Sequence, residues 1–359
     1  MKRYIKNIEP YKSVSQCVYN YKSFDDVLKM DWNESLYNPP PETTADLIEY
    51  LSDNNCRINW YTDIEQKELK NILKNYYKLD PTNFELTAGS DYALELISKV
   101  FLNNGDNVTF ISPTYDQFRV EVIIQGCNFS KFFPKNIFRI TQKDIEEAIA
   151  NYNSNLIYLV NPNNPTGWYL DKKSISNLCA NNPDVTFIID EAYIEFTNFE
   201  SCISLSNKFQ NIIITRSFSK AFALAGARLG SIISSKENIL KINSVRNPKN
   251  INIFSQKLTI SALNNRDYYT EKILEVNNGR NYAYDQLKAL GIETYNTPCN
   301  FLLFKPDNFK ALFNYLKDNK IYVRDLSHLE GLKGFLRMTC GDIGVMDYVI
   351  NTIKRFYNG

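Results

Sequence analysis

The sequence contains a single histidine, His328, among its 359 residues. Such a chain has no metal site built from several histidines and at most one Ser–His or Cys–His catalytic pair. His328 lies in a polar loop, so we expect its side chain to face solvent. Proton transfer would then fall to a lysine, a tyrosine or a carboxylate, and we predict no metal site.

Paired cysteines, long apolar runs and excess charge are also lacking. The seven cysteines are dispersed without a Cys-x-x-Cys pair, which indicates reduced thiols, no zinc site and a cytoplasmic location. No apolar run approaches the roughly 20 residues that span a bilayer, and residues 1–6 carry charge without the apolar segment of a secretory signal. The formal net charge of +1 gives no reason to expect nucleic acid or an anionic membrane as a partner.

Apolar strands alternate with helical segments over much of the chain. The predicted strands are 108–112, 156–160, 185–189, 212–214 and 229–233. This alternation predicts an α/β fold, with a mostly parallel sheet between helices. Beyond about residue 255 the pattern becomes that of a smaller α+β domain. We predict an irregular N-terminal arm (1–43), a large domain (44–255) and a small C-terminal domain (256–359).

Polar residues follow several predicted strands at the point where each strand ends. They are Tyr115, Asn164, Asp190, Tyr193 and Lys220. Ligands of open α/β sheets bind at the carboxyl edge of the strands. Scattered loop residues would not be expected to gather there, so we predict one site at this edge.

Residues 216–230 contain the most informative stretch. Ser217, Ser219 and Lys220 follow an apolar strand, and Arg228 comes eight positions after the lysine. The hydroxyls and Arg228 can hold a phosphate, and the amine can form a Schiff base with an aldehyde. A surface turn with a solvated lysine is the alternative that this stretch alone leaves open.

Further anion-binding candidates lie on either side of this stretch. Ser90 and Asp91 stand at the start of a periodic helix, where free N–H groups favour a phosphate; an ordinary helix cap is the alternative. Arg324 and Arg337 lie at or in strands of the small domain and suit carboxylates or phosphates, although surface ion pairing would also account for them. Tyr61, between a tryptophan and a Thr-Asp pair, is more typical of packing.

The ordered set of motifs resembles fold type I pyridoxal-phosphate enzymes, and within them the histidinol-phosphate aminotransferase group. The motifs are Asn-Pro-Asn-Asn-Pro-Thr-Gly (161–167), Asp-Glu-Ala-Tyr-Ile-Glu-Phe (190–196), Ser-Lys-Ala-Phe (219–222), Leu-Ala-Gly-x-Arg-Leu-Gly (224–230) and Asn-Phe-Leu-Leu-Phe (300–304). The resemblance covers nearly the whole chain. It implies that the large domain binds pyridoxal 5′-phosphate and that the chain is a class I/II aminotransferase.

The resemblance also implies roles for individual residues around the cofactor. Lys220 would hold the cofactor covalently and move a proton, and Asp190 would pair with the ring nitrogen. Tyr193 and Asn164 would bind the phenolic oxygen of the ring, and Tyr115 would stack on its face. The cofactor phosphate would be held by Ser217, Ser219, Arg228 and the backbone of Ser90 and Asp91.

Other implied roles concern the substrate and a second subunit. Arg337 would bind a substrate carboxylate near the Asn33 segment, and Arg324 a phosphate at the far end of the substrate. Tyr11 and Asn252 would line the same pocket. Tyr61 would reach the cofactor phosphate of a neighbouring subunit, which implies a homodimer.

The amino-acid sequence leaves the reaction and the substrate open. The default is transamination between an amino acid and a phosphorylated carbonyl compound, either a histidinol-phosphate-like or a three-carbon phosphate. Decarboxylation of an amino-acid phosphate, phosphoserine or phosphothreonine, is the alternative, since the same cofactor serves both. A ligand sensor would need a DNA-binding segment that the short arm does not supply. A nicotinamide dehydrogenase would need a Gly-x-Gly-x-x-Gly motif after a strand, which the chain lacks.

Overall fold

The computed structural model describes residues 14–358, so the predicted pocket residue Tyr11 lies outside the described part of the chain. The described residues form a seven-stranded sheet in the large domain, and it is mostly parallel, as the sequence predicts. In spatial order its strands are β2 (Phe84–Thr87), β8 (Gly230–Ile233), β7 (Ile212–Ser217), β6 (Thr186–Asp190), β5 (Leu156–Val160), β3 (Asn107–Ile111) and β4 (Asn128–Phe132). Neighbours from β7 to β4 are parallel, and β8 runs antiparallel to both β7 and β2.

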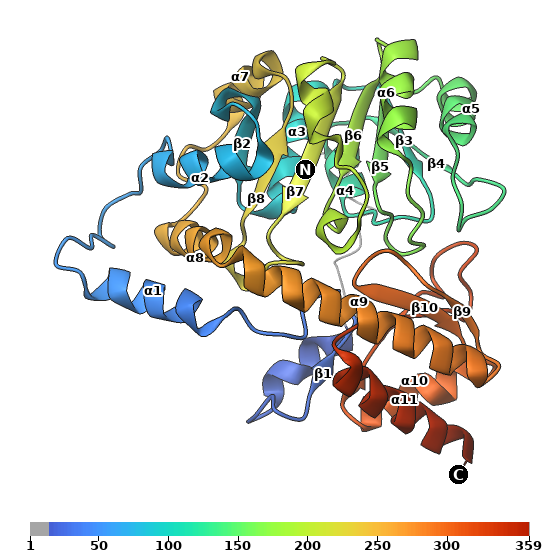
Figure 1. Ribbon diagram of the computed structural model, residues 1–359. Coiled ribbons are helices and arrows are strands. Elements are labelled where there is room, and N and C mark those ends of the chain that lie inside the picture. The colour runs from blue at the N-terminus through green and yellow to red at the C-terminus, as the bar shows by residue number, and fades with distance from the viewer. Residues whose placement is uncertain (1–13, 359) are drawn as a thin grey trace.

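Helices cover both faces of this sheet (Figure 1). They are α2 (Lys67–Tyr77), α3 (Gly89–Phe101), α4 (Phe118–Ile124), α5 (Gln142–Tyr152), α6 (Lys172–Asn181) and α7 (Lys236–Val245). The connections β2→β3 and β3→β4 run one way along the sheet, whereas β4→β5 and β5→β6 run the other way. Right-handed crossovers therefore place α3 and α4 on one face and α5 and α6 on the other.

The sheet is apolar on both faces because helices cover both faces. All five residues of β5 are buried, and so are residues 212–214 of β7. Strands of this kind read as continuous Val/Ile/Leu runs, which is why the sequence predicts them closely. The sequence makes no assignment for β4 and α5. Strand β4 is an edge strand with one buried residue, so its apolar pattern is weak.

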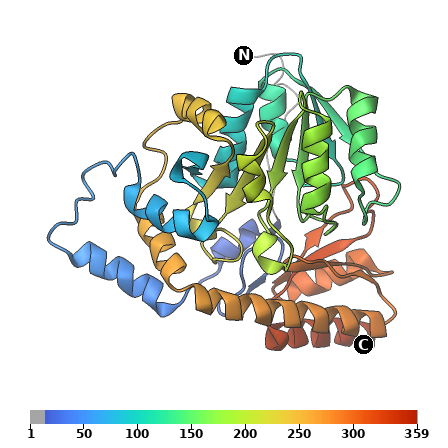
Figure 2. The same ribbon diagram turned by 45° about the horizontal axis from the view of Figure 1, so that its top comes forward.

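The small domain is built on a four-stranded antiparallel sheet. Its order is β12 (Arg324–Asp325), β13 (Leu336–Thr339), β10 (Phe301–Lys305) and β9 (Glu293–Tyr295). Its helices are α9 (Arg266–Ala289), α10 (Phe309–Asp318) and α11 (Ile343–Asn358). Helix α9 is long and packs against α11; both views of the chain show the two side by side (Figures 1 and 2).

The N-terminal arm is more regular than the sequence predicts. It contains the 3-10 helix η2 (Val14–Asn20) and a short strand, β1 (Leu28–Lys29), which pairs in parallel with β11 (Ile321–Tyr322) of the small domain. The Thr339 N–H donates to the carbonyl of Met30 at 2.9 Å. A two-residue strand has no periodicity to read, so only the tertiary pairing defines it.

Two helices lie at the predicted domain boundaries. Helix α1 (Pro41–Ser52) begins with residues that the sequence analysis places in the arm, and α8 (Ile253–Asn264) continues across residue 255. The two helices pack against each other. The division at 43 and 255 remains a prediction. Among the described residues, no helix has both the length and the apolar character needed to cross a membrane.

Candidate active site

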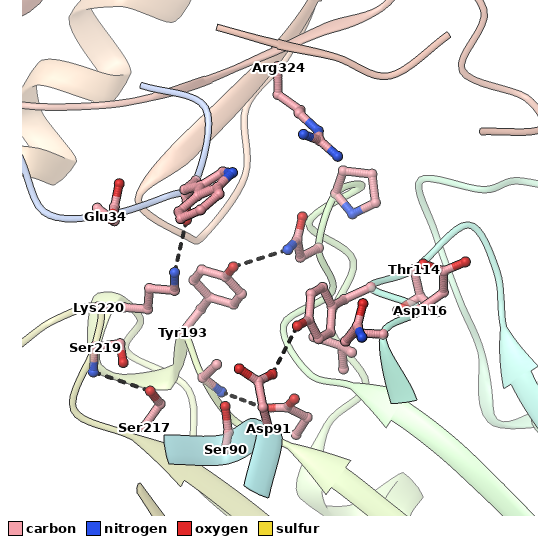
Figure 3. Close-up of a pocket in the computed structure, with 18 of the residues that line it drawn as sticks. Glu34, Ser90, Asp91, Thr114, Asp116, Tyr193, Ser217, Ser219, Lys220 and Arg324 are labelled. Atoms are coloured by element: carbon pink, nitrogen blue, oxygen red, sulfur yellow. Dashed lines mark hydrogen bonds between the residues drawn. The ribbon is translucent and has the colours of Figure 1, made fainter. Parts of the chain in front are cut away.

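A cavity of about 1040 Å³ opens at the carboxyl edge of the large sheet, beneath the small domain (Figure 3). It collects residues from both domains and from the arm. Of the residues predicted from the sequence, those that line it are Ser90, Asp91, Tyr115, Asn164, Asp190, Tyr193, Ser217, Ser219, Lys220, Arg228, Arg324 and Arg337. The predicted convergence at one edge of the sheet therefore appears in the structure.

Three predicted residues within the described part of the chain do not line this cavity. Asn33 is buried beside it, between the lining residues Trp32 and Glu34. Asn252 is exposed and caps α8 by accepting a hydrogen bond from the Ser255 N–H. Tyr61 is 78% exposed, and its ring lies under the Lys249 ammonium at 3.9 Å.

Lys220 stands on the turn that follows β7. Its amine donates a hydrogen bond to the Trp32 carbonyl at 2.9 Å, and Ser35 of the same arm segment donates to the Lys220 carbonyl. Burial lowers the pKa of Lys220 from 10.5 to about 8, and the nearby Arg337 lowers the pKa further. A substantial neutral fraction therefore exists near pH 8, which is the form of an amine that attacks an aldehyde. This burial excludes the alternative of a solvated surface lysine.

Asp190 is the last residue of β6 and is only 3% exposed. The Tyr158 hydroxyl donates to its Oδ2 at 3.1 Å, and the Ala192 N–H donates to its Oδ1 at 3.1 Å. Burial nevertheless raises the pKa of Asp190 from 3.8 to about 6, because desolvation outweighs these bonds. No lysine or arginine in residues 14–358 forms a salt bridge with this carboxylate. A buried carboxylate without a cation suits a protonated ring nitrogen.

Tyr193 connects the two domains through its hydroxyl. That oxygen accepts hydrogen bonds from the side-chain amides of Asn164, at 3.1 Å, and Asn33, at 3.0 Å. Arg337 of β13 donates in turn to the Asn164 side-chain oxygen and to the Asp31 carbonyl. Burial raises the pKa of Tyr193, so its hydroxyl remains protonated at neutral pH. The arm and the large domain therefore meet at this hydroxyl, and the small domain is linked to it through Arg337 and Asn164.

The start of α3 forms another wall of the cavity. Arg228 Nη2 lies 3.1 Å from Asp91 Oδ2, and the Tyr115 hydroxyl donates to Asp91 Oδ1 at 2.9 Å (Figure 3). Gly89 has φ +83°, which favours glycine, and a Cβ there would lie 2.6 Å from Arg228 Nη2, so a larger residue would displace the guanidinium. The helix N-terminus, two serine hydroxyls and a guanidinium make this wall suited to a phosphate.

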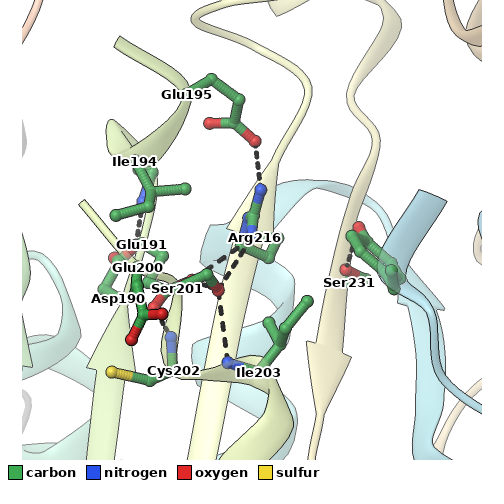
Figure 4. A network of polar contacts seen from close by, with 12 residues as sticks. Asp190, Glu191, Ile194, Glu195, Glu200, Ser201, Cys202, Ile203, Arg216 and Ser231 are labelled. Carbon is green, nitrogen blue, oxygen red and sulfur yellow. Dashed lines mark hydrogen bonds and ion pairs between the residues drawn. The ribbon is translucent and has the colours of Figure 1, made fainter. Parts of the chain in front are cut away.

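A buried ion network fixes the loops behind Asp190 and Lys220 (Figure 4). Arg216, in β7, contacts Glu191 at 3.2 Å through Nη1 and donates to Glu195 through Nη2. Glu191 also accepts from the Cys202 N–H at 2.6 Å. Glu191 lies within the Asp190–Tyr193 loop and Glu195 follows it, and Arg216 precedes Ser217. The network therefore links the two loops that present the polar residues of the cavity.

Several lining residues are not identified from the sequence. Trp32 contributes its backbone carbonyl, which no side-chain motif signals. Thr215 does not line the cavity, but it lies directly opposite Asp190 in the β6–β7 register, a proximity that strand alignment could have suggested. His328 is exposed, as expected, but it also lines the cavity together with Arg119. In residues 14–358, no cluster of three or more His, Cys, Asp or Glu side chains is placed to hold a metal ion.

The donor set fits pyridoxal 5′-phosphate. A weakly basic buried amine, a buried carboxylate without a cation and a phosphate-binding wall face one cavity, which matches the aldehyde, the ring nitrogen and the phosphate of that cofactor.

Comparison with known proteins gives a consistent result. Residues 25–353 match the family "Aminotransferase class I and II". The chain is 37% identical over 357 residues to a dihydroxyacetone phosphate transaminase of Campylobacter jejuni, covering 98% of this chain and 96% of that protein. It is 32% identical over 352 residues to a histidinol-phosphate aminotransferase of a Thermoanaerobacter species, with coverages of 98% and 96%.

A solved structure gives the same fold. The histidinol-phosphate aminotransferase of Sinorhizobium meliloti, in complex with pyridoxal-5′-phosphate, superimposes with a TM-score of 0.88 at 22% identity, over 99% of this chain and 98% of that one. The fold class and the family resemblance inferred from the sequence are thus confirmed. The chain belongs to the class I and II aminotransferases and is a pyridoxal-phosphate-dependent enzyme.

Proposed function

We infer that the chain transfers an amino group between an amino-acid donor and a small phosphorylated carbonyl compound. The observation that carries this inference is the shared cavity, which holds the low-pKa amine of Lys220 at one end and Arg324 of the small domain at the other. The relatives support the same conclusion, because both curated relatives described above act on phosphorylated compounds by name. The substrate is accordingly a histidinol-phosphate-like or a three-carbon phosphate.

The proposed roles of the cofactor-facing residues follow from their contacts. When bound, the cofactor supplies the aldehyde and the electron sink. The Lys220 amine holds it and later moves a proton at the reacting carbon, and Asp190 keeps a proton on the ring nitrogen. Tyr193 and Asn164, already hydrogen-bonded to each other, bind the phenolic oxygen of the ring. Tyr115, held by Asp91, covers the face of the ring.

The phosphate of the cofactor is assigned to the wall formed by the start of α3. Ser217, Ser219 and Arg228 supply side-chain donors, and Ser90 and Asp91 supply the free N–H groups of the helix N-terminus. The Asp91 carboxylate orients Arg228 through the 3.1 Å ion pair. Both partners are about half exposed, so this pair positions the guanidinium more than it adds stability.

Substrate recognition is assigned to the small domain and the arm. Arg337 binds the carboxylate of the amino donor, since it already contacts Asn164 and the Asp31 carbonyl beside the lysine. Arg324 binds the phosphate at the other end of the partner substrate. Asn33 acts from behind the wall through Tyr193. Asn252 and Tyr11 remain predictions for the same pocket.

The functional unit is proposed to be a homodimer in which Tyr61 completes the site of the second subunit. Helix α1 and the segment after it project from one side of the chain in both views (Figures 1 and 2). This segment exposes Ile58 (62%), Trp60 (69%) and Tyr61 (78%) to solvent. Contiguous exposed apolar side chains of this size indicate a protein interface. The seven free cysteines support a reducing, cytoplasmic environment.

The test is a substrate screen that scores two products separately. Phosphorylated ketones are offered with glutamate or alanine, and phosphoserine and phosphothreonine are offered alone. We expect a 2-oxo acid from the donor and the amine of the phosphorylated ketone, without carbon dioxide. Release of carbon dioxide without a 2-oxo acid would establish the decarboxylase alternative.

The role of Lys220 is tested independently of the substrate. Borohydride reduction of the purified holoenzyme should fix the cofactor on this lysine, as measured by peptide mass spectrometry, and Lys220→Ala should lose turnover. A label on a different lysine contradicts the assignment.

A further inference from the structure

The end of the cavity far from Lys220 contains basic side chains from both domains. Arg119 lies on α4 of the large domain, whereas Arg324 and His328 belong to β12 and the loop after it in the small domain. The surrounding walls are aliphatic, from Val120, Leu326 and Leu329, and Asp116 is the carboxylate at this end. In the cavity lining, the side chains at this end are therefore predominantly basic.

The loop that carries His328 has a defined conformation. The Leu326 N–H donates to the Phe335 carbonyl at 3.0 Å, and the Ser327 N–H donates to the Asp325 side chain at 2.8 Å. Leu332, in the middle of the loop, is fully buried. His328 therefore has a defined position at the cavity, although its own side chain is exposed.

The same loop lies against the large domain. A Cβ on Gly331 would be 3.0 Å from the Cδ1 of Ile137. Beside it, Phe138 stacks on Tyr295 with ring centroids 3.7 Å apart. These contacts hold the small domain against the large domain, so the basic side chains of both domains face the same cavity.

The electrostatic environment of His328 places it between the two domains. Partial desolvation inside the cavity lowers its pKa, and Arg324 lowers the pKa further, whereas Asp325 and Asp116 raise it. Asp116 also pairs with Arg119, but only through Nε at 3.6 Å, and shares its carboxylate with Lys131 at 3.8 Å. The contact between Asp116 and Arg119 is longer than a hydrogen bond, so the carboxylate offsets only part of the charge of the guanidinium.

We propose that Arg119 and His328 form, with Arg324, an inter-domain subsite that selects the dianionic phosphate of the substrate. The inference rests on the proposed function, because it names the group that the same cavity recognises. Two basic residues from one domain and one from the other can surround a phosphate, each donating to a different oxygen. The subsite thereby distinguishes a phosphorylated carbonyl compound from its dephosphorylated analogue.

Selectivity is measured with matched substrates. Holoenzyme and its Arg119→Gln and His328→Gln variants are assayed on a phosphorylated substrate and on the same compound without the phosphate. Each variant should lower kcat/KM for the phosphorylated compound by about tenfold, as expected for a charge-assisted contact at a partly exposed site. The value for the unphosphorylated compound should stay unchanged. Arg266→Gln, which removes an exposed charge at the start of α9, is the control for net charge.

A second measurement isolates the subsite from catalysis. Sulfate keeps its charge over roughly pH 5 to 8, where histidine titrates. Its binding to the holoenzyme, followed by calorimetry, should weaken as the pH rises through the pKa of His328, because the cationic imidazole is lost. The charged groups that act on this imidazole are Arg324, Asp325 and Asp116, and Arg119 lines the same cavity and pairs with Asp116. In His328→Gln the pH dependence should disappear while Arg119 and Arg324 still bind the anion.

The outcomes separate this inference from the proposed function. Equal losses on both members of the substrate pair, or sulfate binding with the same pH dependence in wild type and His328→Gln, would overturn the subsite. Absence of turnover with every phosphorylated carbonyl compound in the wild-type enzyme would instead overturn the proposed function.

Discussion

We expect the buried carboxylate of Asp190 to lower the stability of the cofactor-free fold and to strengthen cofactor binding. Its pKa is about 6 in the folded chain and 3.8 without the influence of the fold. Between pH 3.8 and about pH 6 the folded state therefore binds more protons than the unfolded state. The contribution of Asp190 to the free energy of unfolding therefore falls as the pH rises from about 3.8 to about 6, and the loss is complete above that range. At neutral pH the carboxylate destabilises the cofactor-free chain.

The magnitude follows from the same two values. A rise from 3.8 to about 6 corresponds to about 3 kcal/mol. Asp190→Asn removes the charge, but its amide nitrogen cannot accept the hydrogen bonds that the carboxylate oxygens accept, which costs about 1 kcal/mol. We expect the cofactor-free variant to be more stable than cofactor-free wild type by about 1–2 kcal/mol at pH 7.5.

The cofactor-bound proteins should show the opposite order. The ring nitrogen loses its charged partner in Asp190→Asn, and breaking a buried ion pair costs about 3–5 kcal/mol, or roughly a hundredfold or more in affinity. The assay is urea unfolding of cofactor-free protein at several pH values, together with the dissociation constant of the cofactor.

The comparison between pH values is decisive. The stability advantage of Asp190→Asn should be absent near pH 4 and grow to its full value near pH 6.5. An advantage that does not change with pH, or a cofactor-free variant less stable than wild type at pH 7.5, would refute the reasoning. Tyr158→Phe serves as a second variant, since it removes one hydrogen bond to the carboxylate and should raise the pKa of Asp190 further.

Three further predictions concern the scaffold and the second subunit. Arg216→Met leaves the buried Glu191 and the partly buried Glu195 without their cation and should lower the free energy of unfolding by about 3–5 kcal/mol in urea titrations; an unchanged midpoint would contradict the role of the network. Gly230→Ala places a Cβ 2.8 Å from three backbone atoms and should lower the free energy of unfolding by at least about 1–3 kcal/mol. Gly226→Ala, whose Cβ meets nothing within 4 Å, should leave the free energy of unfolding unchanged. Tyr61→Ala should leave the melting temperature nearly unchanged but lower cofactor retention after dialysis, and equal retention would argue against its action across an interface.

The large sheet could be predicted because its strands are buried on both faces. Continuous apolar runs as short as 156–160 and 212–214 are typical of strands covered by helices on both sides, and their polar C-terminal neighbours indicated the functional edge. The position of β8 in the sheet could not be predicted. A short strand that follows a loop has no sequence feature that distinguishes parallel from antiparallel pairing.

Local sequence patterns do not predict the structure of the arm or the residues at the far end of the cavity. Strand β1 exists only through its partner β11, almost 300 positions away in the sequence. The contact between the Lys220 amine and the Trp32 carbonyl involves a backbone atom, which residue identity does not reveal. His328 was correctly expected to be exposed, but its place in the cavity depends on how two domains pack, and no motif records that packing.

The closure of the arm onto β13 has a consequence for how the enzyme is made. The hydroxyl of Thr339 donates to the carbonyl of Met30, across 309 positions of the chain. Domains generally fold as units during synthesis, the N-terminal ones first. The large sheet can therefore assemble while the C-terminal helices are still being translated, but the segment that covers Lys220 finds its partner only after residue 339 has left the ribosome. The nascent chain thus carries an open, incomplete centre until residue 339 has emerged.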